Sequence, residues 1–160
     1  MVLIVNQQQR LWLPLRCIHR QLTELLDCSG YGGWDLGVHF VDNQRIQQLN
    51  HQYRMKDRPT DILSFPFHDA NSSPESFRRQ ALLTEDGRNL GDIFLATPYI
   101  LDHCRINNER LADHLPVLFT HGLCHLMGYD HELDEDYLAM SKREKEILQK
   151  YHHKGKVVPF

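Results

Sequence analysis

Three histidines, His121, His125 and His131, follow one another in the pattern H-x-x-x-H-x-x-G-x-x-H. On a helix, side chains four positions apart face the same way, so His121 and His125 can converge on one ion. Gly128 can take the left-handed conformation that ends a helix, and the returning chain would bring His131 to the same ion. Three imidazoles hold zinc at ~2.0–2.1 Å and leave a fourth position for water. The spacing therefore predicts one catalytic Zn²⁺ per chain, although nickel and copper also bind imidazole.

The helix that would carry two of these histidines is otherwise almost wholly apolar from Val117 to Met127, which indicates burial. Buried imidazoles are costly unless a partner satisfies them. A metal is one such partner. The alternative is a pair of core histidines bonded to carbonyl groups, with His131 exposed to solvent.

Other side chains near this segment have two interpretations each. Cys124 could bind a metal, but a small buried apolar residue is the better interpretation. Asp130 could orient an imidazole or could shape a turn, and both interpretations stay open. His152 and His153 are interpreted as a solvated pair near the end of the chain.

Arg54, Lys56 and Arg58 form a basic cluster in a protein whose formal net charge is −3. A guanidinium stays charged and matches the geometry of a phosphate. Taken alone, such a cluster is usually a solvated turn, because isolated surface charges contribute little. Any nucleic-acid binding must therefore depend on a local patch of this kind and not on global charge.

The composition is that of a globular protein, with 41% hydrophobic and 24% charged residues among 160. No segment approaches the roughly 18 apolar residues needed to span a bilayer, so no membrane association is expected. The opening residues do not read as a secretory signal. The four scattered cysteines are therefore expected to be reduced thiols inside a cell and not two disulfides.

Strands and helices are predicted in mixed order, which indicates a single α+β domain over residues 1–160 with a small mixed sheet. Short apolar or alternating runs predict strands at 2–5, 36–41, 62–67 and 91–96, and Pro66 places the third at an edge or at a strand end. Helices are expected from Pro14 to about Gly30, over 117–127 and over 134–150. Two more are expected to begin after a capping residue, one after Asp42 and one after Thr97, with Pro98 at the first helical position of the latter. Pro116 either starts the fourth helix or kinks a longer one.

Periodicity also predicts which helical residues share a face. In the helix after Asp42, Ile46, Leu49 and Tyr53 are expected to lie on one face. The last helix begins acidic and ends basic, in agreement with the helix dipole. Its apolar stripe is expected to run through Tyr137, Met140, Ile147 and Tyr151. Residues 68–89 are polar and rich in turn formers, and are expected to form one long mobile loop that could act as a substrate lid.

The histidine pattern resembles that of the metzincin proteases in metal geometry only. In those enzymes a general-base glutamate directly follows the first histidine, whereas Gly122 stands at that position here. A protease that lacks this base needs another, and none is evident nearby.

A second resemblance extends over most of the chain. The segments HGLCHLMGYDH at 121–131, YRMKDRPTDILSFP at 53–66 and LGDIF at 90–94 are together similar to the YbeY family. The members of that family are zinc-dependent single-strand endoribonucleases of ribosomal RNA maturation in bacteria and organelles. The resemblance implies that His121, His125 and His131 are metal ligands and that Arg54 is catalytic and binds RNA. Roles for Lys56 and Arg58 in RNA binding stay open.

Three functions are considered on this basis. The first is a zinc endoribonuclease acting on ribosomal RNA, with ribosomal proteins or small-subunit assembly factors as further partners. The second is a zinc metalloprotease-like hydrolase, and the third is a non-catalytic assembly factor stiffened by zinc. The first 23 residues contain Arg10, Arg16 and Arg20 but no acid, as in a mitochondrial presequence. The same stretch is expected to supply a strand and a helix of the domain, so its removal as a presequence would disrupt the fold. Both a bacterial-type cytoplasm and a mitochondrial matrix therefore stay open as compartments.

Overall fold

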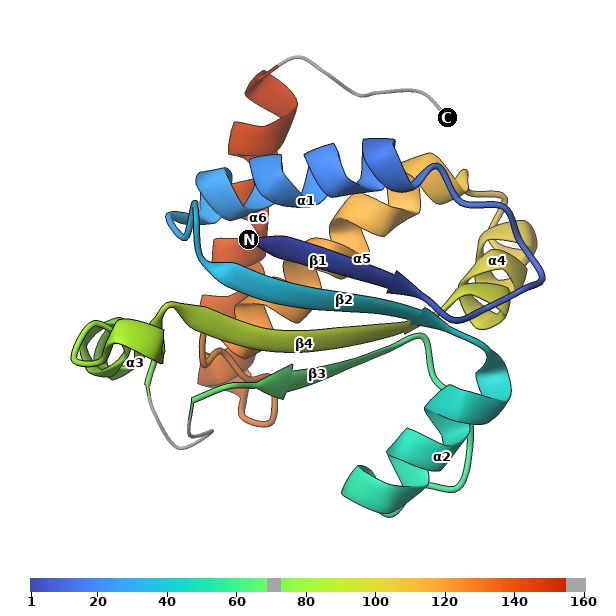
Figure 1. The fold of residues 1–160 in the computed structure, drawn as a ribbon, viewed down its shortest axis with the longest axis horizontal. Coiled ribbons are helices and arrows are strands. Elements are labelled where there is room, and N and C mark those ends of the chain that lie inside the picture. Colours follow the sequence, from blue (N-terminus) through green and yellow to red (C-terminus); the bar gives the residue numbers. More distant parts are fainter. Residues whose placement is uncertain (69–72, 155–160) are drawn as a thin grey trace.

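Four strands form one mixed sheet in the order β1-β2-β4-β3 in the computed structural model, which describes residues 1–68 and 73–154. The strands β1, β2 and β4 are parallel, and β3 runs antiparallel to β4 at the edge. Along the chain the elements are β1 (Val2–Asn6), α1 (Leu15–Ser29), β2 (Asp35–Val41), α2 (Asn43–Arg54), β3 (Ile62–Pro66), α3 (Pro74–Ala81), the short 3₁₀ helix η1 (Glu85–Gly87), β4 (Asn89–Ala96), α4 (Thr97–Ile106), α5 (Leu111–Leu126) and α6 (Asp134–His153) (Figure 1). The predicted α+β class with a small mixed sheet is confirmed.

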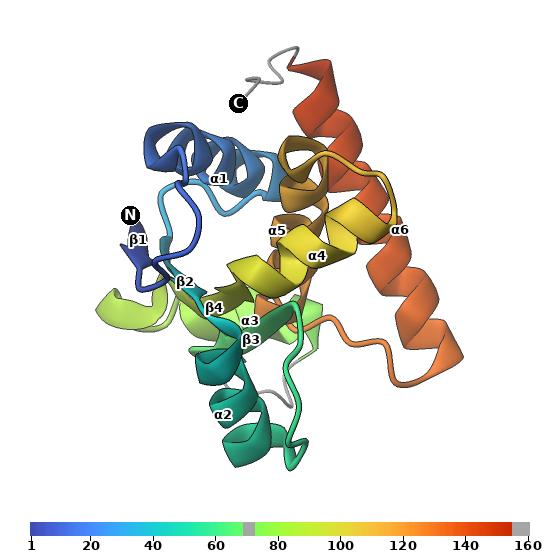
Figure 2. The same ribbon diagram turned by 90° about the vertical axis from the view of Figure 1, so that its right-hand side faces the viewer.

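The helices cover the two faces of this sheet unequally. Figure 2 shows α1, α5 and α6 on one side and α2 on the other. On the first side, the alternating residues Leu36, Val38 and Phe40 of β2 are buried in the main core. A smaller cluster lies beneath α2 and includes Ile46 and Leu49. The sheet therefore supports α5 from one face and α2 from the other.

The helix α5 runs through the core and begins at Leu111, so Pro116 lies inside a longer helix and does not start one. Since proline has no backbone N–H, the carbonyl of Ala112 loses its usual helical partner. The carbonyl of Pro116 itself accepts a hydrogen bond from the Thr120 hydroxyl at 2.7 Å. Both predicted ligand positions on this helix, His121 and His125, lie between fully buried neighbours such as Phe119 and Leu123.

The predicted helix starts need correction. Asp42 occupies the N-cap position of α2, but its side chain makes no capping hydrogen bond. The cap of α4 is Ala96, and Thr97 is already helical, with its hydroxyl buried. Pro14 likewise occupies the cap position of α1 and does not lie in its first turn. None of these three helix starts has a side-chain capping hydrogen bond.

The segment 68–89, predicted to be one long loop, contains α3 and η1. The part at 69–72 lies outside the described residues. The helix α3 begins after Ser73, whose hydroxyl accepts a hydrogen bond from the Ser76 N–H at 3.2 Å, with Pro74 in the first turn. Phe77 and Ala81 are buried, and the Phe77 ring contacts Tyr31. The turn-forming residues Ser73 and Pro74 thus begin a helix. The mobility of segment 68–89 and its role as a substrate lid stay predictions.

Two tyrosines that share a helical face with buried apolar residues in the predicted pattern are themselves exposed. Tyr53 on α2 is 60% exposed and meets the edge of Phe65 on β3 at a ring separation of 5.0 Å. Tyr137 on α6 is 59% exposed, whereas Met140, Ile147 and Tyr151 are buried as expected. The first turn of α6 therefore extends beyond the core.

Two further findings concern the cysteines and the helices. All four cysteines are free, as expected for reduced thiols. No helix among residues 1–68 and 73–154 is both long enough and apolar enough to cross a membrane.

Candidate metal centre and basic pocket

Two of the three predicted ligands lie one turn apart on α5, with their side chains converging. Nε2 of His121 and Nε2 of His125 are 3.2 Å apart. Two nitrogens bound to one tetrahedral zinc at ~2.0–2.1 Å would lie about 3.3 Å apart. The separation is therefore the one that a shared zinc ion requires.

Gly128 brings the third histidine to this pair. It has a φ of 96°, in the left-handed region, as predicted. Its N–H donates to the carbonyl of His125 at 3.1 Å, and the N–H of Tyr129 donates to the carbonyl of Cys124 at 3.0 Å. This is the Schellman arrangement that ends a helix and reverses the chain. As a result, donor atoms of His121, His125 and His131 all lie within 4.8 Å of one another.

Contacts on the far side of two imidazoles orient their rings. Nδ1 of His125 is 3.1 Å from the carbonyl oxygen of Tyr129. Nδ1 of His121 is 3.5 Å from Oε1 of Glu144 on α6. Both partners are acceptors, which assigns the ring hydrogen to Nδ1 and leaves the Nε2 lone pair free to bind a metal. Glu144 is a functional candidate that the sequence pattern did not reveal.

The environment keeps His125 unprotonated. Burial, followed by the neighbouring His121 and His131, lowers the pKa of His125 from 6.5 to about 4. Near neutral pH the unprotonated Nε2 of His125 therefore lies 3.2 Å from Nε2 of His121, an arrangement that a bound cation would stabilise. A tetrahedral zinc fits this donor set.

The other candidates in this part of the sequence do not belong to the group of donor atoms that the three histidines form. Cys124 is fully buried, and burial raises the pKa of its thiol to about 12. Oδ1 of Asp130 accepts a hydrogen bond from the backbone N–H of His131 at 2.7 Å, so the turn interpretation of Asp130 agrees with the structure. His152 and His153 are exposed at the end of α6.

Another group of possible metal donors lies near the α4–α5 turn and was not predicted. Donor atoms of His103, Glu109 and His114 lie within 4.8 Å of one another. Nδ1 of His114 is already 2.9 Å from Oε2 of Glu109. The group lines neither of the two cavities described next.

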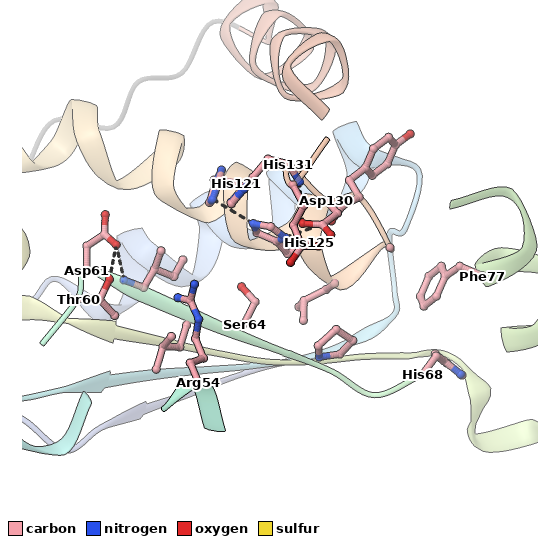
Figure 3. Close-up of a pocket in the computed structure, with 17 residues that line it drawn as sticks. Arg54, Thr60, Asp61, Ser64, His68, Phe77, His121, His125, Asp130 and His131 are labelled. Carbon is pink, nitrogen blue, oxygen red and sulfur yellow. Dashed lines mark hydrogen bonds between the residues drawn. The ribbon is translucent and has the colours of Figure 1, made fainter. Parts of the chain in front are cut away.

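The three histidines line a cavity of about 420 Å³, called here the metal cavity. Its opposite wall comes from α2 and the following turn, from β3, and from the segment around α3. The polar and aromatic lining residues are Arg54, Thr60, Asp61, Ser64, His68, Phe77, His121, His125, Tyr129, Asp130, His131 and Glu132. Figure 3 shows Arg54 rising from α2 on the side opposite the histidines, with Ser64 on the strand between them. Arg54 and the three histidines, predicted separately, thus share one cavity.

Lys56 and Arg58 do not reach the metal cavity. They line a neighbouring cavity of about 430 Å³, called here the basic pocket, together with Asn50, Arg54, Pro59, Thr60 and Tyr99. Since Arg54 and Thr60 line both cavities, the two cavities adjoin. The basic cluster therefore lies beside the predicted metal site.

Gly122 lies on the face of α5 that packs against the sheet. A Cβ atom at this position would be 2.9 Å from Cδ1 of Ile62 and 2.9 Å from Cδ1 of Ile93. A glutamate here would point into the sheet side chains. The residue that serves as base in the metzincin proteases therefore has no place in this packing.

The family profile and the sequence relatives that match this chain share one description. A family profile described as Endoribonuclease YbeY matches residues 4–152. The human Endoribonuclease YbeY is 39% identical over 150 residues, which cover 92% of this chain and 87% of the human protein. That of Alkaliphilus oremlandii is 36% identical over 151 residues, covering 92% of this chain and 94% of the relative. The solution structure of a Thermotoga maritima protein matches with a TM-score of 0.56 and 22% identity, over 97% of this chain and 94% of that one, and supports the fold.

The site and these likenesses define an enzyme of the hydrolase class, a nuclease. The chain belongs to the YbeY family of endoribonucleases, in agreement with the resemblance found in its sequence.

Proposed function

We propose that residues 1–160 form one catalytic domain, a zinc-dependent endoribonuclease that cleaves single-stranded RNA in ribosomal RNA processing and ribosome maturation. The observation that supports this most directly is the metal cavity, which places three imidazole donors opposite an arginine. The donor set fits one zinc ion per chain, held by His121, His125 and His131.

Each part of the site has a chemical task in this proposal. When bound, zinc supplies Lewis acidity toward a phosphoryl oxygen and makes a bound water more acidic. The guanidinium of Arg54 binds the remaining phosphoryl oxygens and stabilises negative charge as the phosphodiester is cleaved. Glu144 and the Tyr129 carbonyl hold two imidazoles in their ligand orientation.

The proposed substrate is RNA, as the names of the relatives state for those proteins. Lys56 and Arg58 add positive charge beside the metal cavity and are proposed to bind RNA with Arg54. Ribosomal RNA, and ribosomal proteins or assembly factors as partners, follow from the family resemblance. The proposed compartment is the bacterial-type cytoplasm or the mitochondrial matrix.

Two other functions were considered from the sequence. A protease is disfavoured because Gly122 packs against the sheet and offers no general base beside the metal ligands. A non-catalytic assembly factor would tolerate the loss of one ligand. Full biological function of a folded His125→Ala variant, with no RNA cleavage in vitro, would favour that third possibility.

Arg54 provides the test of a nuclease mechanism. We expect Arg54→Ala to lower the single-turnover rate of single-stranded RNA cleavage by roughly two to three orders of magnitude, as when one preorganised donor is removed. Zinc content and thermal stability should hardly change, since Arg54 is exposed and is not a ligand. Arg54→Lys should restore only part of the rate, because an ammonium cannot make the two-pronged contact.

Arg45 gives a matched control for this experiment. It is an exposed arginine on the same helix α2 and lines neither cavity. Arg45→Ala should cleave RNA at the wild-type rate. Wild-type cleavage by Arg54→Ala would remove Arg54 from the mechanism, and loss of zinc or unfolding in that variant would make the arginine structural.

A further inference from the structure

The charges that line the metal cavity do not by themselves attract RNA. Arg54 is opposed there by the three carboxylates of Asp61, Asp130 and Glu132, which leaves two negative charges when the histidines are neutral. The two positive charges of a zinc ion would only cancel this excess. Since binding of nucleic acid depends largely on cations that neutralise phosphates, most of the affinity must come from outside this cavity.

The adjoining basic pocket has the opposite character. Arg54, Lys56 and Arg58 line it, and no carboxylate does. Asp57 belongs to the same turn, but its Oδ1 accepts a hydrogen bond from Nε2 of Gln47 at 3.0 Å. None of the ion pairs among the described residues involves the three cations. They are therefore available to an anionic ligand.

The turn that carries these cations is held in place before any ligand binds. The N–H of Lys56 donates to the carbonyl of Asn50 at 3.2 Å, next to Met55, whose φ is 57°. The buried side chain of Asn50 donates from Nδ2 to the carbonyl of Arg58 at 2.9 Å. A preorganised turn loses less conformational entropy when it binds a ligand.

Tyr99 completes the basic pocket from the first turn of α4. Its N–H donates to Oδ1 of Asn43 at 3.0 Å, which connects this turn to the start of α2. The side chain is partly exposed and lines the pocket. Aromatic rings in this position stack on unpaired bases with little preference for sequence.

We propose that the basic pocket is a separate subsite for the nucleotide next to the scissile phosphate, in which Lys56 and Arg58 bind its phosphate and Tyr99 stacks on its base. This inference rests on the proposed endoribonuclease function and assigns affinity and chemistry to different cavities. Arg54, which lines both, joins them. The metal cavity cleaves, and the basic pocket holds the strand, so an unpaired nucleotide is required beside the cleaved bond.

The test measures affinity and maximal rate together. Single-turnover cleavage of a short oligouridine, which forms no secondary structure, is followed at rising enzyme concentration and at several salt concentrations. We expect Lys56→Ala and Arg58→Ala to raise the half-saturating concentration far more than they lower the maximal rate. Each should also reduce the dependence of log affinity on log salt by about 0.7, the value for one phosphate contact on a single strand.

The tyrosine is tested by a pair of variants. Tyr99→Ala should raise the half-saturating concentration roughly five- to tenfold, whereas Tyr99→Phe, which keeps the ring, should bind like the wild type. Arg45→Ala again controls for the loss of an exposed cation and should change neither affinity nor salt dependence. Fluorescence anisotropy of a labelled oligouridine with metal-free protein, which is not expected to cleave it, measures binding separately from cleavage.

The outcomes separate this inference from the proposed function. If Lys56→Ala and Arg58→Ala cleave RNA with the half-saturating concentration and salt dependence of the wild type, the subsite is overturned and the nuclease function stands. Weakened anisotropy binding in these variants, with no cleavage by the wild type, supports the subsite and removes the nuclease. Absence of both binding and cleavage in the wild type overturns both.

Discussion

Glu144 is the carboxylate that orients His121, and its replacement by glutamine tests whether the contact supports metal binding. Nδ1 of His121 and Oε1 of Glu144 are 3.5 Å apart, at the outer limit of a hydrogen bond, and both side chains are partly buried. Loss of a partner of this kind lowers metal affinity 10- to 100-fold in general. Because the contact is long, we expect the lower end, about tenfold or ~1.4 kcal/mol.

The assay is competition for zinc against a chromophoric chelator near neutral pH, with thermal melting of each variant. Glu146→Gln is the matched control, because Glu146 lies on the same helix and pairs with Arg143 at 3.2 Å. The control should keep the wild-type zinc affinity. Wild-type affinity in Glu144→Gln, or equal losses in both variants, would show that Glu144 does not orient the ligand.

Three more predictions concern the ligand helix and its end. Gly128→Val should lower the free energy of unfolding by more than about 1 kcal/mol and should weaken zinc binding by displacing His131. Gly33→Val, at a position that also has a positive φ (81°), should lower stability but leave zinc affinity unchanged. Equal zinc affinity in the two variants would contradict this prediction. Folding lowers the pKa of His125 from 6.5 to about 4. Between these two pH values His125 is protonated in the unfolded chain but not in the folded metal-free protein, so the free energy of unfolding falls as the pH is lowered. Urea unfolding of metal-free protein should therefore show that the free energy of unfolding falls by at most about 2 kcal/mol between pH 7 and pH 5. An equal fall in His125→Gln would show that His125 is not the group responsible. Cys124, buried and with a raised pKa, should not react with a thiol reagent until the protein unfolds, and rapid labelling of native protein at this residue would contradict its burial.

Local spacing was enough to predict that His121, His125 and His131 lie together. His121 and His125 belong to one helix, and Gly128 ends that helix in the conformation that its sequence position indicated. Interactions within and just after one helix follow from its geometry, so they can be derived without tertiary information. The basic cluster indicated Arg54 as one of three cations, its catalytic role came from the family resemblance, and only the fold places it in the metal cavity.

Features created by packing between distant segments were not predicted. Glu144 reaches His121 because α5 and α6 pack together, and nothing in the spacing of either helix indicates this. The helix α3 is short and polar, and its burial depends on the contact of Phe77 with Tyr31. Tyr99 lines the basic pocket only because the start of α4 is hydrogen-bonded to the start of α2.

The central claim is that RNA cleavage requires one metal ion held by His121, His125 and His131. Titration of zinc into metal-free protein, with the single-turnover rate of single-stranded RNA cleavage measured at each step, tests it most directly. The account predicts no cleavage without metal, a rate that rises and saturates at one equivalent per chain, and no rise in a folded His125→Ala variant. Full cleavage by metal-free protein, or a zinc-dependent rise in His125→Ala equal to that of the wild type, would contradict it.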